Sequence, residues 1–133
     1  MDSKKPEYST DLGMVRMSNE VVSVAASMAA SEVDGVSAMA SSGTAGLFEK
    51  LSRKNLHKGV AVEAAGENTL IDVYITVEYG YAIQGVAEKV QRDVKAAVEN
   101  LTGLTVGAVN VHVVEVTKMR VAEAAKPSAG QAD

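Results

Sequence analysis

The stretch "IDVYITVEYGYAIQGVAEKVQRDVKAAVENLTGLTVGAVNVHVVEV" (Ile71–Val116) changes its hydrophobic period twice. Its first part alternates apolar and polar residues as far as Tyr79, which is typical of a strand with one buried face. Its last part alternates in the same way around Val109. Between them, an apolar stripe at three- and four-residue steps predicts an amphipathic helix that ends at Gly103. The stripe consists of Ile83, Val86, Ala87, Val90, Val94, Ala97, Val98 and Leu101.

The residues before this stretch predict further strands and another helix. "GMVRMS" is interpreted as a short strand that stops at Ser18, a favourable N-cap for a helix that runs to Gly35. "VSAMASSGTAG" begins as a short strand and continues as a loop. "VAVEAA" and "LIDVYITVEY" alternate in twos and are joined at "GEN", which predicts a hairpin.

This order predicts an α+β fold with two layers: a mixed or antiparallel sheet of about four to five strands, with two main helices packed on one face. The chain has 133 residues, of which 47% are hydrophobic, enough for one packed core. We expect residues 1–12 to be a disordered lead, residues 13–117 to be a single domain, and residues 118–133 to be a flexible tail rich in Ala, Ser, Gly and Pro.

The first predicted helix is unusual because it carries no charge between Glu20 and Glu32. Ser23, Ser27 and Ser31 follow each other at four-residue spacing and form one narrow hydroxyl stripe. The helix is either buried on nearly all sides within one chain, or it packs on the sheet and also against another subunit. For the second interpretation, the predicted self-association residues are Ser23, Ala26, Ser27 and Ala30.

A glycine pair at the strand-to-helix junction raises the question of a nucleotide site. Gly80 and Gly85 have the spacing with which a phosphate-binding loop begins. Such a loop continues with Lys and then Ser or Thr, whereas here Val86 and Ala87 follow and belong to the apolar stripe. We therefore predict a structural role for both glycines and no nucleotide cofactor.

No other pattern predicts catalysis or metal binding. The chain has no Cys, and neither His57 nor His112 has acidic or histidine neighbours at ligand spacing. Glu115 is three residues from His112, a pattern typical of a solvated pair. No serine lies in a G-x-S-x-G elbow. We predict no catalytic, metal or cofactor residues, and a protein that is not an enzyme.

A basic segment is the one feature with binding potential. Net charge is −4, yet residues 47–58 concentrate basic side chains. They form either a solvated face, or a contact with anionic lipid or an acidic partner into which Phe48 dips. The predicted contact residues are Phe48, Lys50, Arg53, Lys54 and Lys58.

An alternative function uses the same region. "GTAG" (Gly43–Gly46) matches the G-x-x-G loop with which KH domains clamp a nucleic-acid backbone, and the basic segment Lys50–Lys58 follows it. The alternative is therefore a KH-like module for single-stranded nucleic acid. Its middle residues are uncharged and the protein is acidic, so nucleic acid is the less favoured partner.

Three blocks in this order resemble the alkaline shock protein family of Gram-positive bacteria, also called the general-stress or envelope-stress family. They are Gly13–Val36, "KNLHKGVAVE" (Lys54–Glu63) and Ile71–Val116. One departure is Gln84, where the family pattern commonly has Pro.

The resemblance implies a cytoplasmic, non-catalytic protein linked to the envelope stress response or homeostasis. It implies self-association, contacts with family relatives, and in some members attachment to the inner face of the membrane through an anchored partner. The polar start and the lack of a long apolar run agree with an expected cytoplasmic location.

Overall fold

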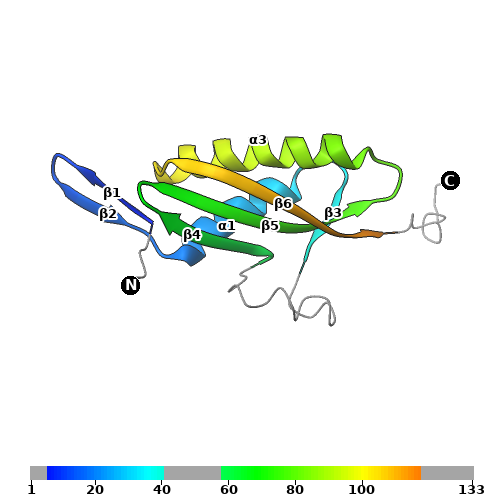
Figure 1. Ribbon diagram of the computed structural model, residues 1–133, viewed down its shortest axis with the longest axis horizontal. Coiled ribbons are helices and arrows are strands. Elements are labelled where there is room, and N and C mark those ends of the chain that lie inside the picture. The colour runs from blue at the N-terminus through cyan, green and yellow to red at the C-terminus, as the bar shows by residue number, and fades with distance from the viewer. Residues whose placement is uncertain (1–5, 41–57, 118–133) are drawn as a thin grey trace.

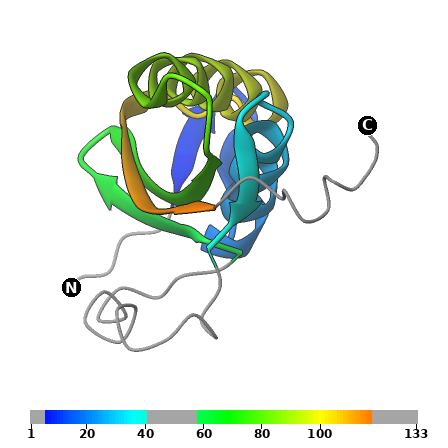
Figure 2. The ribbon, with the colours of Figure 1, turned by 90° about the vertical axis from the view of Figure 1, so that its right-hand side faces the viewer.

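The computed structural model describes residues 6–40 and 58–117 and shows an α+β fold (Figure 1). Within these residues a four-stranded mixed sheet carries helices on one face, as the sequence predicts, and a two-stranded hairpin precedes it (Figure 2). The elements are β1 Glu7–Thr10, β2 Gly13–Arg16, α1 Asn19–Ser31, β3 Val36–Met39, β4 Val60–Ala65, β5 Asn68–Glu78, α3 Ile83–Thr102 and β6 Val106–Thr117.

Strand β5 is the centre of the sheet. It pairs antiparallel with β3 and β4 and parallel with β6. The N–H of Tyr74 donates to the C=O of Gly59 over 2.8 Å, and the C=O of Tyr74 accepts from the N–H of Ala40 over 2.9 Å. Because both groups of one strand residue face the same edge, β3 and β4 lie end to end along one edge of β5, and β6 occupies the other.

The core lies between the sheet and the helices. Every second residue of β5 from Ile71 to Val77 is fully buried, and so are Val90, Val94 and Val98 of α3. Helix α1 adds Val22, Ala26 and Ala30, each with no exposed surface. Small side chains at these positions let α1 lie close to the sheet, since their Cβ atoms need little space. The predicted alternation of β5 and the apolar stripe of α3 therefore both match the buried residues.

Helix α1 begins as predicted and ends earlier. The side chain of Ser18 accepts a hydrogen bond from the N–H of Val21 at 3.2 Å. The helix ends at Ser31 rather than near Gly35, with Glu32 as its C-cap. Gly35 follows in a tight turn with a φ of +102°, and a Cβ there would lie 2.7 Å from a methyl group of Val86.

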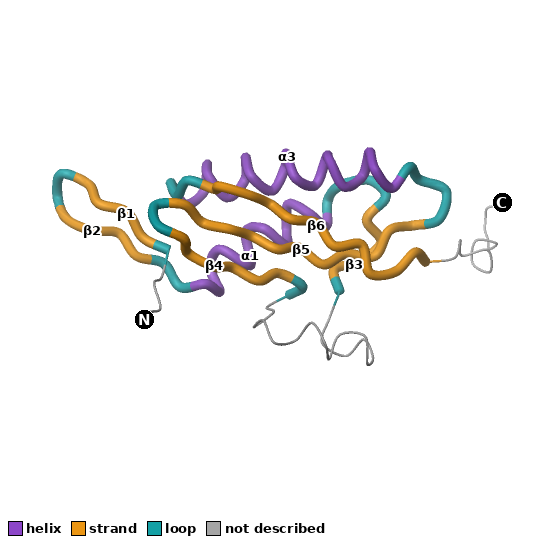
Figure 3. The backbone as a smooth tube through the Cα atoms, viewed as in Figure 1, coloured by secondary structure: helices purple, strands orange, loops and turns teal. Residues whose placement is uncertain are grey.

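The N-terminal residues differ from the expected disordered lead. Glu7–Thr10 pairs with Gly13–Arg16 to form a hairpin that extends beyond the main sheet (Figure 3). The N–H of Met17 donates to the C=O of Pro6, and Arg16 forms an ion pair with Glu7 at 2.9 Å. Tyr8 packs on the core and against Gly103. Sequence periodicity does not reveal this strand because its four residues are almost all polar and exposed.

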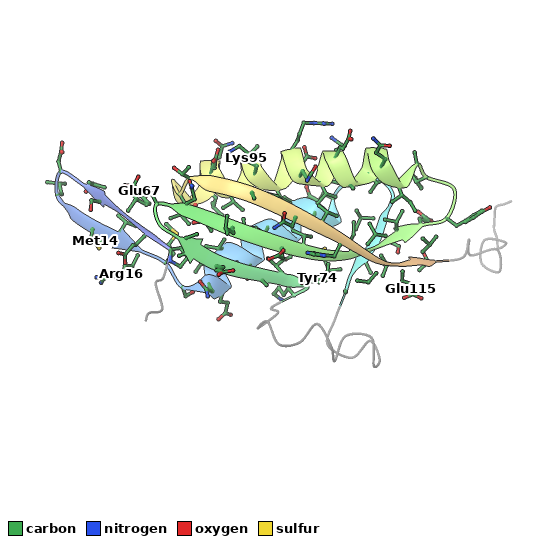
Figure 4. All side chains as sticks on the ribbon, in the orientation of Figure 1. Met14, Arg16, Glu67, Tyr74, Lys95 and Glu115 are labelled. Atoms are coloured by element: carbon green, nitrogen blue, oxygen red, sulfur yellow. The ribbon has the colours of Figure 1, made fainter. Side chains whose placement is uncertain are left out.

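Helix α3 covers the start of the outer edge of β6. The carboxylate of Glu99 accepts from the N–H of Val106 at 2.8 Å, and Lys95 donates to the C=O of the same residue at 3.1 Å (Figure 4). Lys95 and Glu99 also pair with each other at 2.8 Å. The amide of Gln91 donates to the C=O of Val109 at 3.0 Å. These side chains take the place of a neighbouring strand, which protects a sheet edge from unwanted pairing.

We expect Gly35→Ala to destabilise the fold more than Gly66→Ala. Both glycines have positive φ, which costs other residues about 1–2 kcal/mol. Only at Gly35 would the new Cβ also meet Val86 and Tyr81, for a total loss of roughly 2–4 kcal/mol. Urea unfolding of both variants measures the difference. Equal losses would contradict the close packing at Gly35.

We also expect Glu99→Gln to reduce the acid sensitivity of the fold. The hydrogen bond from Lys95, and then that from the N–H of Val106, hold the pKa of Glu99 below its usual value of 4.5. A depressed folded-state pKa stabilises the fold above the unfolded-state pKa, and this stability is lost as the pH falls through the folded-state pKa.

The measurement is urea unfolding of wild type and Glu99→Gln from neutral pH into this acidic window. Wild type should lose more stability on acidification than Glu99→Gln. Glu67→Gln, at the exposed turn between β4 and β5, is the control and should follow wild type. Parallel curves for wild type and Glu99→Gln would rule out this role of the carboxylate.

Candidate interaction surfaces

An apolar groove of about 420 Å³ lies between α1 and α3. Small residues of both helices, including Ala25, Ala29 and Ala97, line it together with the larger Met28 and Leu101. The side chains of Met28 and Leu101 are strongly exposed, at 58% and 69%. Glu32 and Asn100 supply its polar lining. A groove of this kind between two helices can accept the apolar side chains of a third helix.

A second groove, of about 430 Å³, lies on the other side of α1. It is lined by Val24, Ser27, Met28, Ser31, Met39, Ala40 and Lys58. Met28 borders both grooves, so the exposed side of α1 forms a ridge between them. Val21 lies on the same side of the helix and is 46% exposed. The ridge is uncharged because no ionisable residue lies between Glu20 and Glu32.

The residues predicted for self-association do not form this ridge. Ser23, Ala26, Ser27 and Ala30 are between 0% and 6% exposed, so a second copy cannot reach them in the folded chain. The hydroxyl of Ser27 donates to the C=O of Val24 at 3.2 Å, which satisfies it inside the structure. The serine stripe therefore points to the interior. Small residues suit a helix–helix contact at the surface, but here the close approach of α1 to the sheet uses them as core.

The far face of the sheet, opposite the helices, carries a histidine–carboxylate pair. Nε2 of His112 on β6 lies 3.0 Å from a carboxylate oxygen of Asp72 on β5. The ring of His112 stacks on Tyr74, with ring centroids 4.4 Å apart and an angle of 10° between the planes. Tyr74 is almost completely buried, whereas the His112 side chain is 41% exposed. The sequence suggests Glu115 as the neighbour of His112, and the structure shows Asp72 instead.

The far face does not assemble a catalytic or metal centre in the described ranges. A hydroxyl network joins Ser37 to Thr76 at 2.8 Å and to Thr117 at 3.2 Å. Among the described residues, no serine or threonine hydroxyl is hydrogen-bonded to His112, whose Nε2 faces Asp72. In residues 6–40 and 58–117, no three His, Cys, Asp or Glu side chains gather as metal ligands.

The structure places only part of the predicted basic contact surface. Phe48, Lys50, Arg53 and Lys54 lie outside the described residues, as do His57 and the Gly43–Gly46 loop. Lys58 is exposed and borders the second groove, with a φ of +58°.

The glycine pair lies where a structural role requires it. Gly80 has a φ of +107° in the turn after β5, and Gly85 is in the first turn of α3. Neither α1 nor α3 is long and apolar enough to cross a membrane, and the described residues contain no other helix that could.

Comparison with known proteins identifies the family. Residues 7–118 match the model of the alkaline shock protein family, which is described as having a cell envelope-related function, and the chain belongs to this family. Two relatives from Bacillus subtilis (strain 168) are the uncharacterized proteins YqhY and YloU. YqhY is 39% identical over 111 residues, which are 84% of this chain and 82% of the relative. YloU is 41% identical over 109 residues, 80% of this chain and 91% of the relative.

A further relative is the uncharacterized protein Spy1614 of Streptococcus pyogenes serotype M6, 36% identical over 109 residues, or 80% of this chain and 90% of the relative. Among solved structures, MamM-CTD 215-293 covers 72% of this chain and 96% of its own length, at 19% identity. Its TM-score of 0.44 carries no argument about function. The family match and the Bacillus relatives confirm the resemblance seen in the sequence.

We expect His112→Phe to retain more stability than His112→Ala. Both variants lose the contact with Asp72, but Phe keeps a flat ring against Tyr74. Stacked aromatic pairs contribute about 0.5–1.5 kcal/mol beyond their buried area, which sets the size of the expected difference. Thermal and urea unfolding measure it. Equal destabilisation by both substitutions would show that the stacking contributes nothing.

Proposed function

We propose that the protein is a non-catalytic adaptor or scaffold of the cell-envelope stress response or homeostasis, and that it acts by protein–protein contact. Membership of a family with a cell envelope-related description supports the biological setting. The residues described offer surfaces for contact, whereas their one histidine–carboxylate pair packs against a buried tyrosine.

The groove between α1 and α3 is the observation that carries this proposal. A helix on the surface of a monomer normally presents charged residues to water. Here the exposed side of α1 presents Val21 and Met28, and Leu101 of α3 faces the same groove. Keeping large apolar side chains in water is unfavourable, and their burial by a partner would recover about 25 cal/mol for each Å² removed from water.

The partner that fits best is an amphipathic helix. The alanines of the groove leave room for apolar side chains spaced three and four residues apart on a third helix. Glu32 at the groove favours a basic residue on that helix. Such a helix could belong to a family relative or to a membrane-anchored partner, as the family resemblance implies.

We place the protein in the cytoplasm, at the inner face of the membrane when its partner is anchored there. This location rests on the family resemblance, and the basic segment Lys50–Lys58 would add weak attraction to anionic lipid. The KH-like alternative gains no support from the described residues. A KH loop lies between two helices, whereas β3 follows α1 and pairs with β5.

The test is site-specific photo-crosslinking in cells. A photo-reactive residue at Leu101 should yield discrete adducts with an envelope-associated protein, whereas one at Leu12, which is 99% exposed on the hairpin, should not. The partner identified in this way is then purified and its affinity measured.

Leu101→Glu should weaken binding of the identified partner at least about tenfold, because a charge would enter an apolar contact. Leu12→Glu is the matched control and should bind as wild type does. Identical adducts from the two positions, or unchanged affinity of Leu101→Glu, would contradict the groove as the docking surface.

A further inference from the structure

The outer edge of β6 is only partly covered in the described structure. Its first residues are capped by Gln91, Lys95 and Glu99, which follow one stripe of α3. The stripe continues toward the start of α3 with Glu88 and Gln84, but these two side chains bond to each other at 3.2 Å. Within the described residues, no hydrogen bond from α3 reaches β6 beyond Val109.

The backbone groups at this edge can be identified from the neighbouring bonds. The C=O of Val109 faces outward, since it accepts from Gln91. Residues of a strand face alternate edges, so Val111 and Val113 face outward as well. The C=O of Thr117 accepts from the N–H of Tyr79, which follows β5, so it faces inward and Val116 faces outward. The change of parity agrees with the β-bulge between Val113 and Glu115.

We propose that this edge, from Val111 to Val116, pairs antiparallel with the same edge of a second copy of the chain. The pairing is centred on the bulge and places Val111 opposite Val116 of the second copy. It also places His112 opposite Glu115 of the second copy, and the reverse pair forms on the other side of the twofold axis. Main-chain hydrogen bonds supply the contact and these side chains set the register.

The bulge is what makes this register self-complementary. His112 is in register with Tyr74, and Glu115 with Thr76, so both side chains lie on the far face of the sheet. In a strand without a bulge, residues three apart would lie on opposite faces and could not meet across a twofold axis.

Charge and exposure also favour a second copy as the occupant. His112 is partly exposed and already faces the carboxylate of Asp72, while Glu115 is exposed near the far end of β6 (Figure 4). The proposed register brings a carboxylate to each imidazole without placing like charges opposite each other. The surface is separate from the groove between α1 and α3, so this inference does not depend on the proposed function.

The first test compares Val116→Pro with Val116→Ala in the full chain. Proline removes the outward N–H of Val116 and leaves the inward bonds to β5 in place, which an edge strand tolerates. Sedimentation equilibrium should show a wild-type dimer, a similar dimer for Val116→Ala, and a dissociation constant at least about tenfold higher for Val116→Pro. Unfolding curves of the three proteins check that each is folded.

The second test follows the individual amides and the charge pair. Hydrogen exchange at Val111, Val113 and Val116 should slow as protein concentration rises. Glu115→Lys should weaken the dimer, whereas Glu67→Lys makes the same charge change away from this edge and should not.

Several outcomes would overturn the inference: a strictly monomeric wild type, exchange that is independent of concentration, or a Val116→Pro protein that dimerises as wild type does. If the dimer persists with Val116→Pro and is lost with Leu101→Glu instead, the copies associate through the helical groove and not through β6. If the wild type is monomeric but still binds its partner through Leu101, only this inference fails.

Discussion

The burial of β5 on both faces is the constraint from which the rest of the structure follows. Residues 71–77 are all buried, although they alternate between apolar and polar or aromatic side chains. On the helix side, aliphatic residues such as Ile71 and Ile75 meet the valines of α3 and the small residues of α1. On the far side, a buried carboxylate or hydroxyl must find a hydrogen-bond partner, because leaving it without one costs free energy.

The polar groups of the far face meet this requirement through neighbouring strands. Asp72 contacts His112 of β6, and Thr76 shares a hydrogen bond with Ser37 of β3. These contacts bring together residues 39 and 40 positions apart in the chain. They tie both edges of the sheet to its central strand, which explains why a histidine and a carboxylate can meet here in a structural role.

The helix layer has the opposite character. Helix α3 presents charged residues to solvent and uses three of its polar side chains to cap β6, whereas α1 exposes an apolar ridge between two grooves. The two exposed features, a ridge of side chains and a strand edge of backbone groups, would engage partners by different physical means. One would bury apolar area, and the other would form main-chain hydrogen bonds. An adaptor with both could bind a partner helix and a second copy at the same time.

The sequence by itself determined the period of each main element and much of its burial. The alternation of β5, the apolar stripe of α3 and the cap at Ser18 follow from local rules and agree with the structure. The tertiary structure alone decided which side chains meet. Ser23 and Ser27 became interior residues, His112 found Asp72 rather than Glu115, and a polar N-terminal segment became a strand. Local periodicity defines the faces of an element, but the neighbour of each face depends on strand register and helix placement, which residues distant in the chain jointly set.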